Sequence, residues 1–171
     1  MAKQIMAIIS LSVFAALAFV AYKSWSRRSK AQTLEFGEPQ EALEFFGELL
    51  AQARCLYVAT TYAANHLERI SAYGLGARGN ANVLVFTEGL LIVRTGERPL
   101  AIDRSQIHAV EFTQVAIDKA VEPDGLLSLS WNQDGTELAT QLRIVDSRER
   151  ADVSGAIADI ISSNIKREVN K

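Results

Sequence analysis

A continuous apolar run near the N-terminus limits how this chain can fold. Residues 5–22 contain no charged side chain, and Ser10 and Ser12 are the polar interruptions. A helix of this length rises about 27 Å, close to the ~30 Å hydrocarbon core of a bilayer. The sequence therefore predicts a transmembrane anchor helix over residues 1–22. The apolar side chains expected to face lipid are Ile5, Ile8, Ile9, Leu11, Val13, Phe14, Leu17, Phe19, Val20 and Tyr22.

A cleaved signal peptide is the competing interpretation of this run. Lys3 precedes it, and Ala16-Leu17-Ala18 resembles a cleavage site. The run continues beyond that site, however, and basic residues follow it at once: Lys23, Arg27, Arg28 and Lys30. Such residues stop translocation and remain on the cytoplasmic side. We therefore expect a single-pass protein of the inner cell membrane, with its N-terminus outside and its domain in the cytoplasm. The basic cluster sets this topology and is placed to contact lipid headgroups.

Charge separates the anchor from the rest of the chain. Residues 31–171 contain 13 Lys and Arg against 20 Asp and Glu, a formal net charge of −7. An acidic domain argues against nucleic-acid binding and against broad adhesion to anionic lipid, since both require clustered cations. Cys55 is the only cysteine, which excludes an intrachain disulfide and a thiolate metal cluster.

The organisation of the remaining chain is read from hydrophobic spacing. Residues 23–38 are expected to form a basic and polar tether, and residues 39–171 a single domain. Pro39 stands where a helix can begin, and Leu43, Phe46 and Leu50 have helical spacing, so an amphipathic helix is expected over residues 40–53. That helix would cover the domain or, alternatively, contact a partner.

Short apolar runs separated by turn residues follow, which is the spacing of an antiparallel β barrel or sandwich. Within them Leu138, Thr140 and Leu142 are expected to face inward, and Gln141 is expected to face water. The expected strands cover residues 55–61, 67–73, 82–87, 90–94, 98–103, 106–112, 125–131 and 138–145. A helix from Ser147 to Lys166, capped by Asp146, is expected to close the barrel through Val153, Ile157, Ile160, Ile161 and Ile165. The predicted fold class is mainly β with α.

Several segments resemble a family of small actinobacterial membrane proteins that carry a pleckstrin-homology-like (PH-like) domain behind one N-terminal helix. The resemblance rests on residues 57–61, 69–79, 87–92 and 124–127, with Trp131. It implies a seven-stranded barrel closed by a C-terminal helix, and a genomic link to pyrimidine biosynthesis. Members are sometimes labelled transporters, although one helix cannot form a substrate pathway. The resemblance implies no activity.

Candidate sites were weighed against ordinary structural roles. Residues 74–79 match G-x-G-x-x-G, but a strand is expected after them where nucleotide binding needs a helix, so they are predicted to form an inter-strand loop, with Arg78 as a partner contact. His66 and His108 lack neighbouring ligands, so no metal site is predicted. No catalytic residues and no cofactor are predicted, and the chain is not expected to be an enzyme.

The first inter-strand loop, residues 62–67, contains no Lys or Arg. Lipid-binding members of the PH-like class use cations in that loop, so protein binding becomes the leading hypothesis. We expect a membrane-anchored interaction module that binds the lipid bilayer through its helix and a protein partner through its barrel, by a loop face or a sheet edge. The alternative is an accessory subunit whose helix packs within a larger membrane complex; Ala15, Ala16, Ala18 and Ala21 would permit close helix approach.

Overall fold

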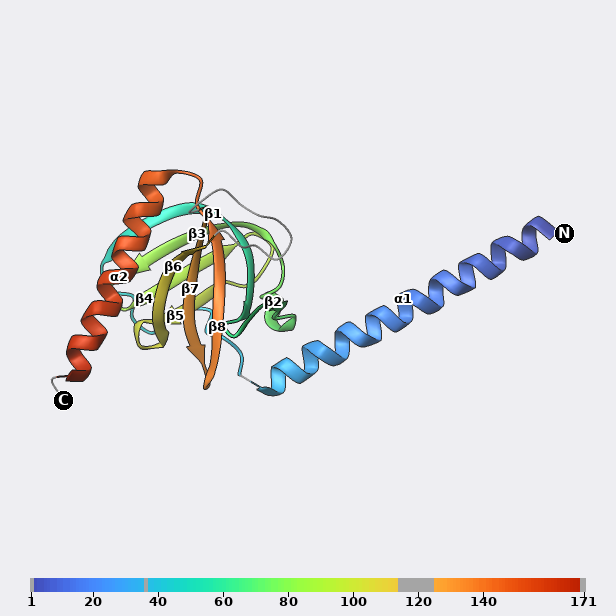
Figure 1. Ribbon diagram of the computed structural model, residues 1–171, viewed down its shortest axis with the longest axis horizontal. Coiled ribbons are helices and arrows are strands. Elements are labelled where there is room, and N and C mark those ends of the chain that lie inside the picture. The colour runs from blue at the N-terminus through green and yellow to red at the C-terminus, as the bar shows by residue number, and fades with distance from the viewer. Residues whose placement is uncertain (1, 36, 114–124, 170–171) are drawn as a thin grey trace.

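The computed structural model describes residues 2–35, 37–113 and 125–169 (Figure 1). A long helix, α1 (Ala2–Glu35), projects from one side of a β barrel, and a second helix, α2 (Ser147–Val169), packs on the side away from α1. Both termini therefore point away from the barrel in opposite directions. The expected order of apolar helix, antiparallel strands and C-terminal helix is confirmed.

The helix α1 does not stop where the apolar run stops. It continues through residues 23–35, a segment that was expected to be a tether. This segment lacks Pro and Gly and is rich in Ser, Arg and Lys, so nothing in it interrupts helical hydrogen bonding. Because the helix is continuous, its apolar part and the barrel are joined by a helical stalk over these residues.

Eight antiparallel strands form the barrel, and each overlaps a strand expected from the sequence. Seven lie in the order β5-β4-β3-β1-β8-β7-β6, and the short β2 pairs with β1. The resemblance implied seven strands, so β2 is the additional one. Their bounds are β1 Leu49–Tyr62, β2 Asn65–Arg69, β3 Gly79–Phe86, β4 Gly89–Arg94, β5 Leu100–Asp103, β6 Ile107–Thr113, β7 Leu126–Gln133 and β8 Thr136–Arg143.

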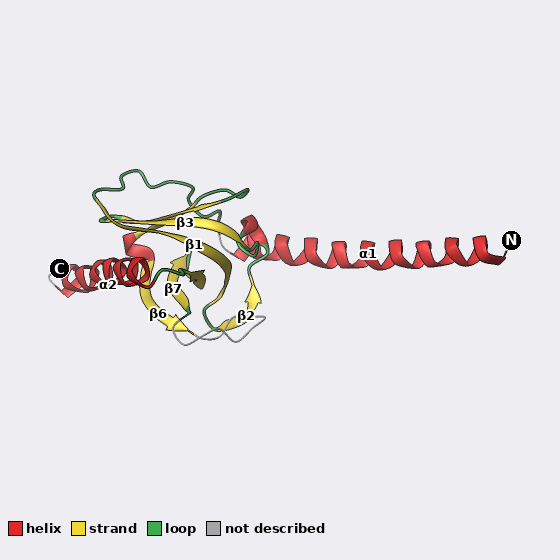
Figure 2. Cartoon of the chain, turned by 90° about the horizontal axis from the view of Figure 1, so that it is seen from above, coloured by secondary structure: helices red, strands yellow, loops and turns green. Residues whose placement is uncertain are grey.

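The long strand β1 joins the two halves of the barrel (Figure 2). Its first part pairs with β3 from Leu49 to Tyr57, and its second part pairs with β8 from Leu56 to Tyr62. The β8 register shifts between Tyr57 and Ala59, where the strand changes partner. A shift of this kind bends a strand and increases its twist, which lets one strand pair in both halves of the barrel.

The prediction of an amphipathic helix over residues 40–53 is wrong. Residues 37–48 are not helical, and β1 begins at Leu49. This segment instead runs along the β3–β4–β5 region, where Ala101 N donates to Gln40 O at 2.8 Å and Glu88 N donates to Phe46 O at 3.2 Å. Gly47 adopts a φ of +75°, which ordinary helix residues avoid. Tertiary backbone pairing therefore overrides a weak helical pattern.

The C-terminal helix closes the core as expected. Val153, Ile157 and Ile160 are buried among barrel side chains and Ile161 is partly buried against them, whereas Ile165 is exposed, so its predicted place in the buried stripe is wrong. Asp146 caps the helix by accepting from Arg148 N and Glu149 N, both at 2.9 Å. These contacts make α2 part of the barrel's hydrophobic core.

The expected alternation along β8 is only partly confirmed. Leu138, Thr140 and Leu142 are fully buried, but Gln141, expected to face water, is also buried. Alternation assumes that one face of the sheet is open to solvent, and that assumption fails at this strand.

Candidate interaction surfaces

The ten apolar side chains predicted to form the anchor all lie on α1, and each is more than half exposed. Among the described residues, α1 is the one helix long and apolar enough to cross a membrane, judged by length and composition. The cluster Lys23, Arg27, Arg28 and Lys30 is exposed on the same helix, between the apolar part and the barrel. The order of apolar span, cations and domain is therefore preserved in three dimensions.

The junction between α1 and the barrel depends on Gln32, which is only 3% exposed to solvent. Its Oε1 accepts from Ser71 N at 2.6 Å and from Ala72 N at 3.2 Å. Its Nε2 donates to Arg69 O at 3.3 Å. A single glutamine thus satisfies three backbone groups beside the turn η1 (Ala72–Gly74), in a segment where the sequence predicted only a tether.

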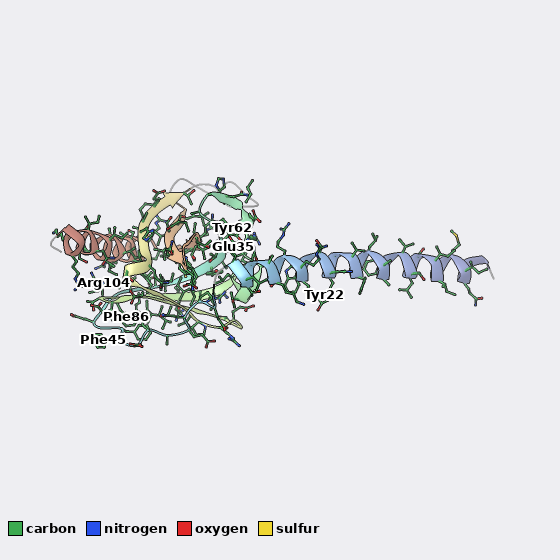
Figure 3. All side chains as sticks on the ribbon, turned by 90° about the horizontal axis from the view of Figure 1, so that it is seen from below. Tyr22, Glu35, Phe45, Tyr62, Phe86 and Arg104 are labelled. Carbon is green, nitrogen blue, oxygen red and sulfur yellow. The ribbon has the colours of Figure 1, made fainter. Side chains whose placement is uncertain are left out.

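Two further hydrogen bonds, made by Glu35 and Gly37, reinforce the junction; Figure 3 labels Glu35 and its partner Tyr62. The Tyr62 hydroxyl donates to Glu35 Oε2 at 2.6 Å, and Gly37 N donates to Asp134 Oδ2 at 2.9 Å. Burial and the Glu35 carboxylate raise the pKa of Tyr62 to about 12, so this phenol remains a donor at neutral pH. The stalk is consequently held to the barrel at several points.

A groove follows the seam between β6 and α2, and we name it the β6–α2 groove. Its first part is a cavity of about 410 Å³ lined by the start of β6 and the end of α2, including Ile107, Ile165 and Arg167. Its second part is a cavity of about 540 Å³ lined by the end of β6, at Val110 and Phe112, and the start of α2. The strand and helix run in opposite directions, so the two cavities succeed each other along one seam.

Small side chains of α2 form one wall of the second cavity. Ser147, Ala151, Ser154, Gly155 and Ala158 recur at helical spacing and face this cavity. A Cβ added to Gly155 would meet no atom within 4 Å, so the space beside it is open. Phe112, on the strand side, is 46% exposed.

Arg104 lies at the first cavity but is committed to the fold. Its Nη2 donates to Ser163 Oγ at 2.6 Å, its Nε donates to Asn164 Oδ1 at 2.9 Å, and its Nη1 donates to Thr87 O at 3.2 Å. Glu88 completes the set with an ion pair at 3.4 Å. The guanidinium therefore ties α2 to the β3–β4 turn.

Exposed apolar side chains also occur on and beside the outer face of β1, β3 and β4, among polar Gln52, Arg54 and Asn82. Phe45, Leu50 and Val93 are exposed there, and the Phe46 and Phe86 rings lie 4.9 Å apart. Figure 3 places Phe45, Phe86 and Arg104 at the end of the barrel away from Tyr22 on α1. Arg104 at the groove, and Phe45 and Phe86 at the outer face, therefore lie far from Tyr22 in the apolar part of α1.

The sequence model of the bacterial PH domain-like family matches residues 37–158. The matched region contains all eight strands and the first half of α2. The chain belongs to the bacterial PH domain-like family. No curated protein matches the chain. The family assignment confirms the PH-like resemblance. The helix α1 lies outside the matched region. Asp124, one of the residues on which the resemblance rested, lies outside the described residues.

The interior of the PH-like barrel contains a buried polar network that sequence reasoning missed. Thr140 Oγ1 accepts from Trp131 Nε1 at 2.9 Å and lies 2.8 Å from Thr60 Oγ1. The Tyr57 hydroxyl lies 2.6 Å from Thr60 Oγ1 and donates to Leu75 O at 2.8 Å. Thr140 on an otherwise apolar strand face was the available signal. The network is satisfied internally, so it specifies the core and offers no binding group.

The glycine-rich segment of the PH-like domain is followed by a strand and not by a helix. It lies between η1 and β3, so a strand follows Gly79, as predicted. Its shape comes from Tyr73 at φ +54° and Gly74 at φ +68°, and a Cβ at Gly76 would approach Ile70 O to 2.8 Å. Arg78 is exposed, consistent with a surface role, but it lies outside the β6–α2 groove.

The remaining chemically distinctive residues are dispersed over the PH-like barrel. His66 lies on β2, and His108 on β6 pairs with Glu137 at 3.1 Å. Cys55 is buried, and burial raises the pKa of its thiol to about 12. No group of three or more His, Cys, Asp or Glu suited to a metal occurs among the described residues.

Proposed function

We propose that this chain is a membrane-anchored protein-interaction module of the inner face of the cell membrane. The observation that carries the proposal is the Gln32 junction, which joins an exposed apolar helix to a PH-like barrel at the end opposite the groove and the outer face. The helix concentrates the module at the bilayer, and the barrel presents its docking surfaces to the aqueous phase.

Helix length supports a protein partner over a lipid ligand. If residues 5–22 span the hydrocarbon core, residues 23–35 extend roughly 20 Å beyond it at 1.5 Å per residue. The headgroup layer is only about 5–8 Å thick on each side. A barrel held upright on this stalk places its distal end beyond the headgroups. The β1–β2 turn, Ala63-Ala64, also lacks a cation.

Photo-crosslinking in native membranes tests this function. A photoreactive residue is introduced in turn at Phe112 in the groove, at Phe45 on the outer face and at Phe14 in the anchor. The exposed α2 residue Asp159 serves as the control position. The module predicts protein adducts of defined mass from a barrel position and none from Asp159. Adducts from Phe14 alone would favour the accessory subunit, and lipid adducts from Phe45 and Phe112 would refute the proposal.

Orientation is tested separately. A reporter that functions only in the cytoplasm is fused after Lys171. The density of basic residues after the apolar run predicts an active reporter. Activity only of an externally functioning reporter would place the barrel outside the cell, and intact mass of the mature protein would show whether residues 1–20 are retained.

A further inference from the structure

The strand β6 has an open edge. It ends the strand order of the sheet, and its pairing with β7 runs from Ile107 to Thr113. No other described strand pairs with residues 107–112. The other terminal strand is different, because Ala101 of β5 donates to Gln40 in the segment that runs beside it. An unpaired edge presents free N–H and C=O groups to an additional strand. The sheet is therefore extendable at β6 and covered in part at β5.

The space beside this edge suits an extended segment. The β6–α2 groove runs along the strand, and at its second cavity the α2 wall has small side chains around Gly155 beside Arg150. On the strand side, Val110 and Phe112 provide apolar contacts for alternate side chains of a new strand. Seven extended residues, the length of β6, cover about 23 Å.

Charge defines the chemistry of the occupant. Among the described residues, the cations that line the two cavities are Arg104, Arg150 and Arg167, His108 is an additional lining residue, and no Asp or Glu lines either cavity. Of these, Arg150 and Arg167 form no ion pair within the described part of the chain. They are 17 positions apart on α2, or about 25 Å, which matches the length of the strand edge. Glu111 is exposed on β6 but lines neither cavity.

We propose that the β6–α2 groove binds an extended acidic segment of a partner protein, which adds a strand to β6. Its apolar side chains pack against Val110 and Phe112, and acidic side chains near its two ends face Arg150 and Arg167. An acidic ligand is complementary to these cations although the domain as a whole is acidic. This inference rests on the proposed function and names the partner class and the site.

The test uses the full chain in phosphatidylcholine nanodiscs and a fluorescein-labelled dodecapeptide. The peptide carries two glutamates at each end and four alternating valine–threonine pairs between them; a second peptide replaces the glutamates with lysines. Fluorescence anisotropy is expected to show the glutamate peptide binding at least about tenfold more tightly than the lysine peptide. Hydrogen exchange at residues 107–112 is expected to slow when the glutamate peptide binds.

Two variants locate the binding. Gly155→Leu fills the groove, and the open space there predicts a folded protein with an undiminished melting temperature. It should weaken peptide binding at least about tenfold, as should Arg167→Glu, whereas Asp152→Leu, at an exposed α2 position that lines neither cavity, should not weaken it. Equal binding of the two peptides, no binding of the glutamate peptide, or binding unchanged in Gly155→Leu would overturn the inference. If crosslinks from Phe45 persist in that case, the interaction module stands and only the groove assignment fails.

Discussion

Replacing Gln32 with alanine removes the side chain that joins α1 to the barrel. The wild-type glutamine makes three hydrogen bonds, two to the backbone N–H groups of Ser71 and Ala72 and one to the carbonyl of Arg69. Ala72 is fully buried, so its N–H has no solvent partner while the helix stays docked. We expect Gln32→Ala to release the stalk from the barrel without unfolding either part.

The magnitude follows from these three bonds. Each contributes about 0.5–1.5 kcal/mol net, and a buried N–H left unpaired costs about 1–3 kcal/mol. A total of about 2–4 kcal/mol corresponds to a shift of roughly 30- to 700-fold in the equilibrium between docked and released helix. The exposed Tyr62–Glu35 hydrogen bond contributes on the order of 1 kcal/mol and does not compensate for this loss.

Distances between spin labels measure the docking directly. Nitroxides are attached at Arg28→Cys on α1 and Arg143→Cys on β8 in the full chain, and buried Cys55 remains unlabelled because its thiol pKa is raised to about 12. The wild-type junction predicts a narrow distance distribution by pulsed electron paramagnetic resonance, and Gln32→Ala predicts a broad one. Thr33→Ala is the control, since the Thr33 hydroxyl bonds only to carbonyls within α1. Equal widths for wild type and Gln32→Ala would refute the reasoning.

Three further predictions concern the core. Ile157→Asp buries a charge beneath α2 and should prevent cooperative folding, measured by urea unfolding, whereas Asp152→Ala on the exposed face should change the free energy of unfolding by less than ~0.5 kcal/mol. Thr140→Val leaves the Trp131 N–H unpaired and should lower the free energy of unfolding by about 1–3 kcal/mol in the same assay; an unchanged value would mean that the network adds no stability. Native Cys55 should resist maleimide at pH 8 and react after denaturation. Folding raises the pKa of this thiol from 9.0 to about 12, so the neutral thiol stabilises the folded protein fully below pH 9, and this contribution is lost as the pH rises towards 12. The urea midpoint of Cys55→Ala should therefore fall less steeply between about pH 9 and 12 than that of the wild type.

The elements of the fold were predictable where the pattern was local and strong. All eight strands were expected, and α2 was found with its Asp146 cap and its buried Ile157, because alternation and helical spacing report directly on which side chains face a core. The N-terminal apolar helix could be predicted for the same reason. The failures occurred where local preference was weak and distant backbone competed, as in residues 37–48, whose pairing with Ala101 and Glu88 replaced the expected helix.

The candidate site was much less accessible to sequence reasoning. The sequence suggested a loop face or a sheet edge and singled out Arg78, but it did not indicate which edge was open. The β6–α2 groove combines residues from 104–112 with residues from 147–167, and its charge pattern appears only after these segments meet. Gln32 likewise looked like one polar residue among many in a linker.

The sequence by itself determined an apolar helix, an acidic β domain and an amphipathic closing helix, because each depends on the hydrophobicity of residues that are close along the chain. Only the tertiary structure decided that Gln32 joins the stalk to the barrel, that Thr140 completes a polar network, and that β6 ends the sheet with β7 as its one described strand partner. These features depend on hydrogen bonds and surfaces formed between residues distant in the sequence. No periodicity records such pairings, since they exist only once the backbone has closed on itself.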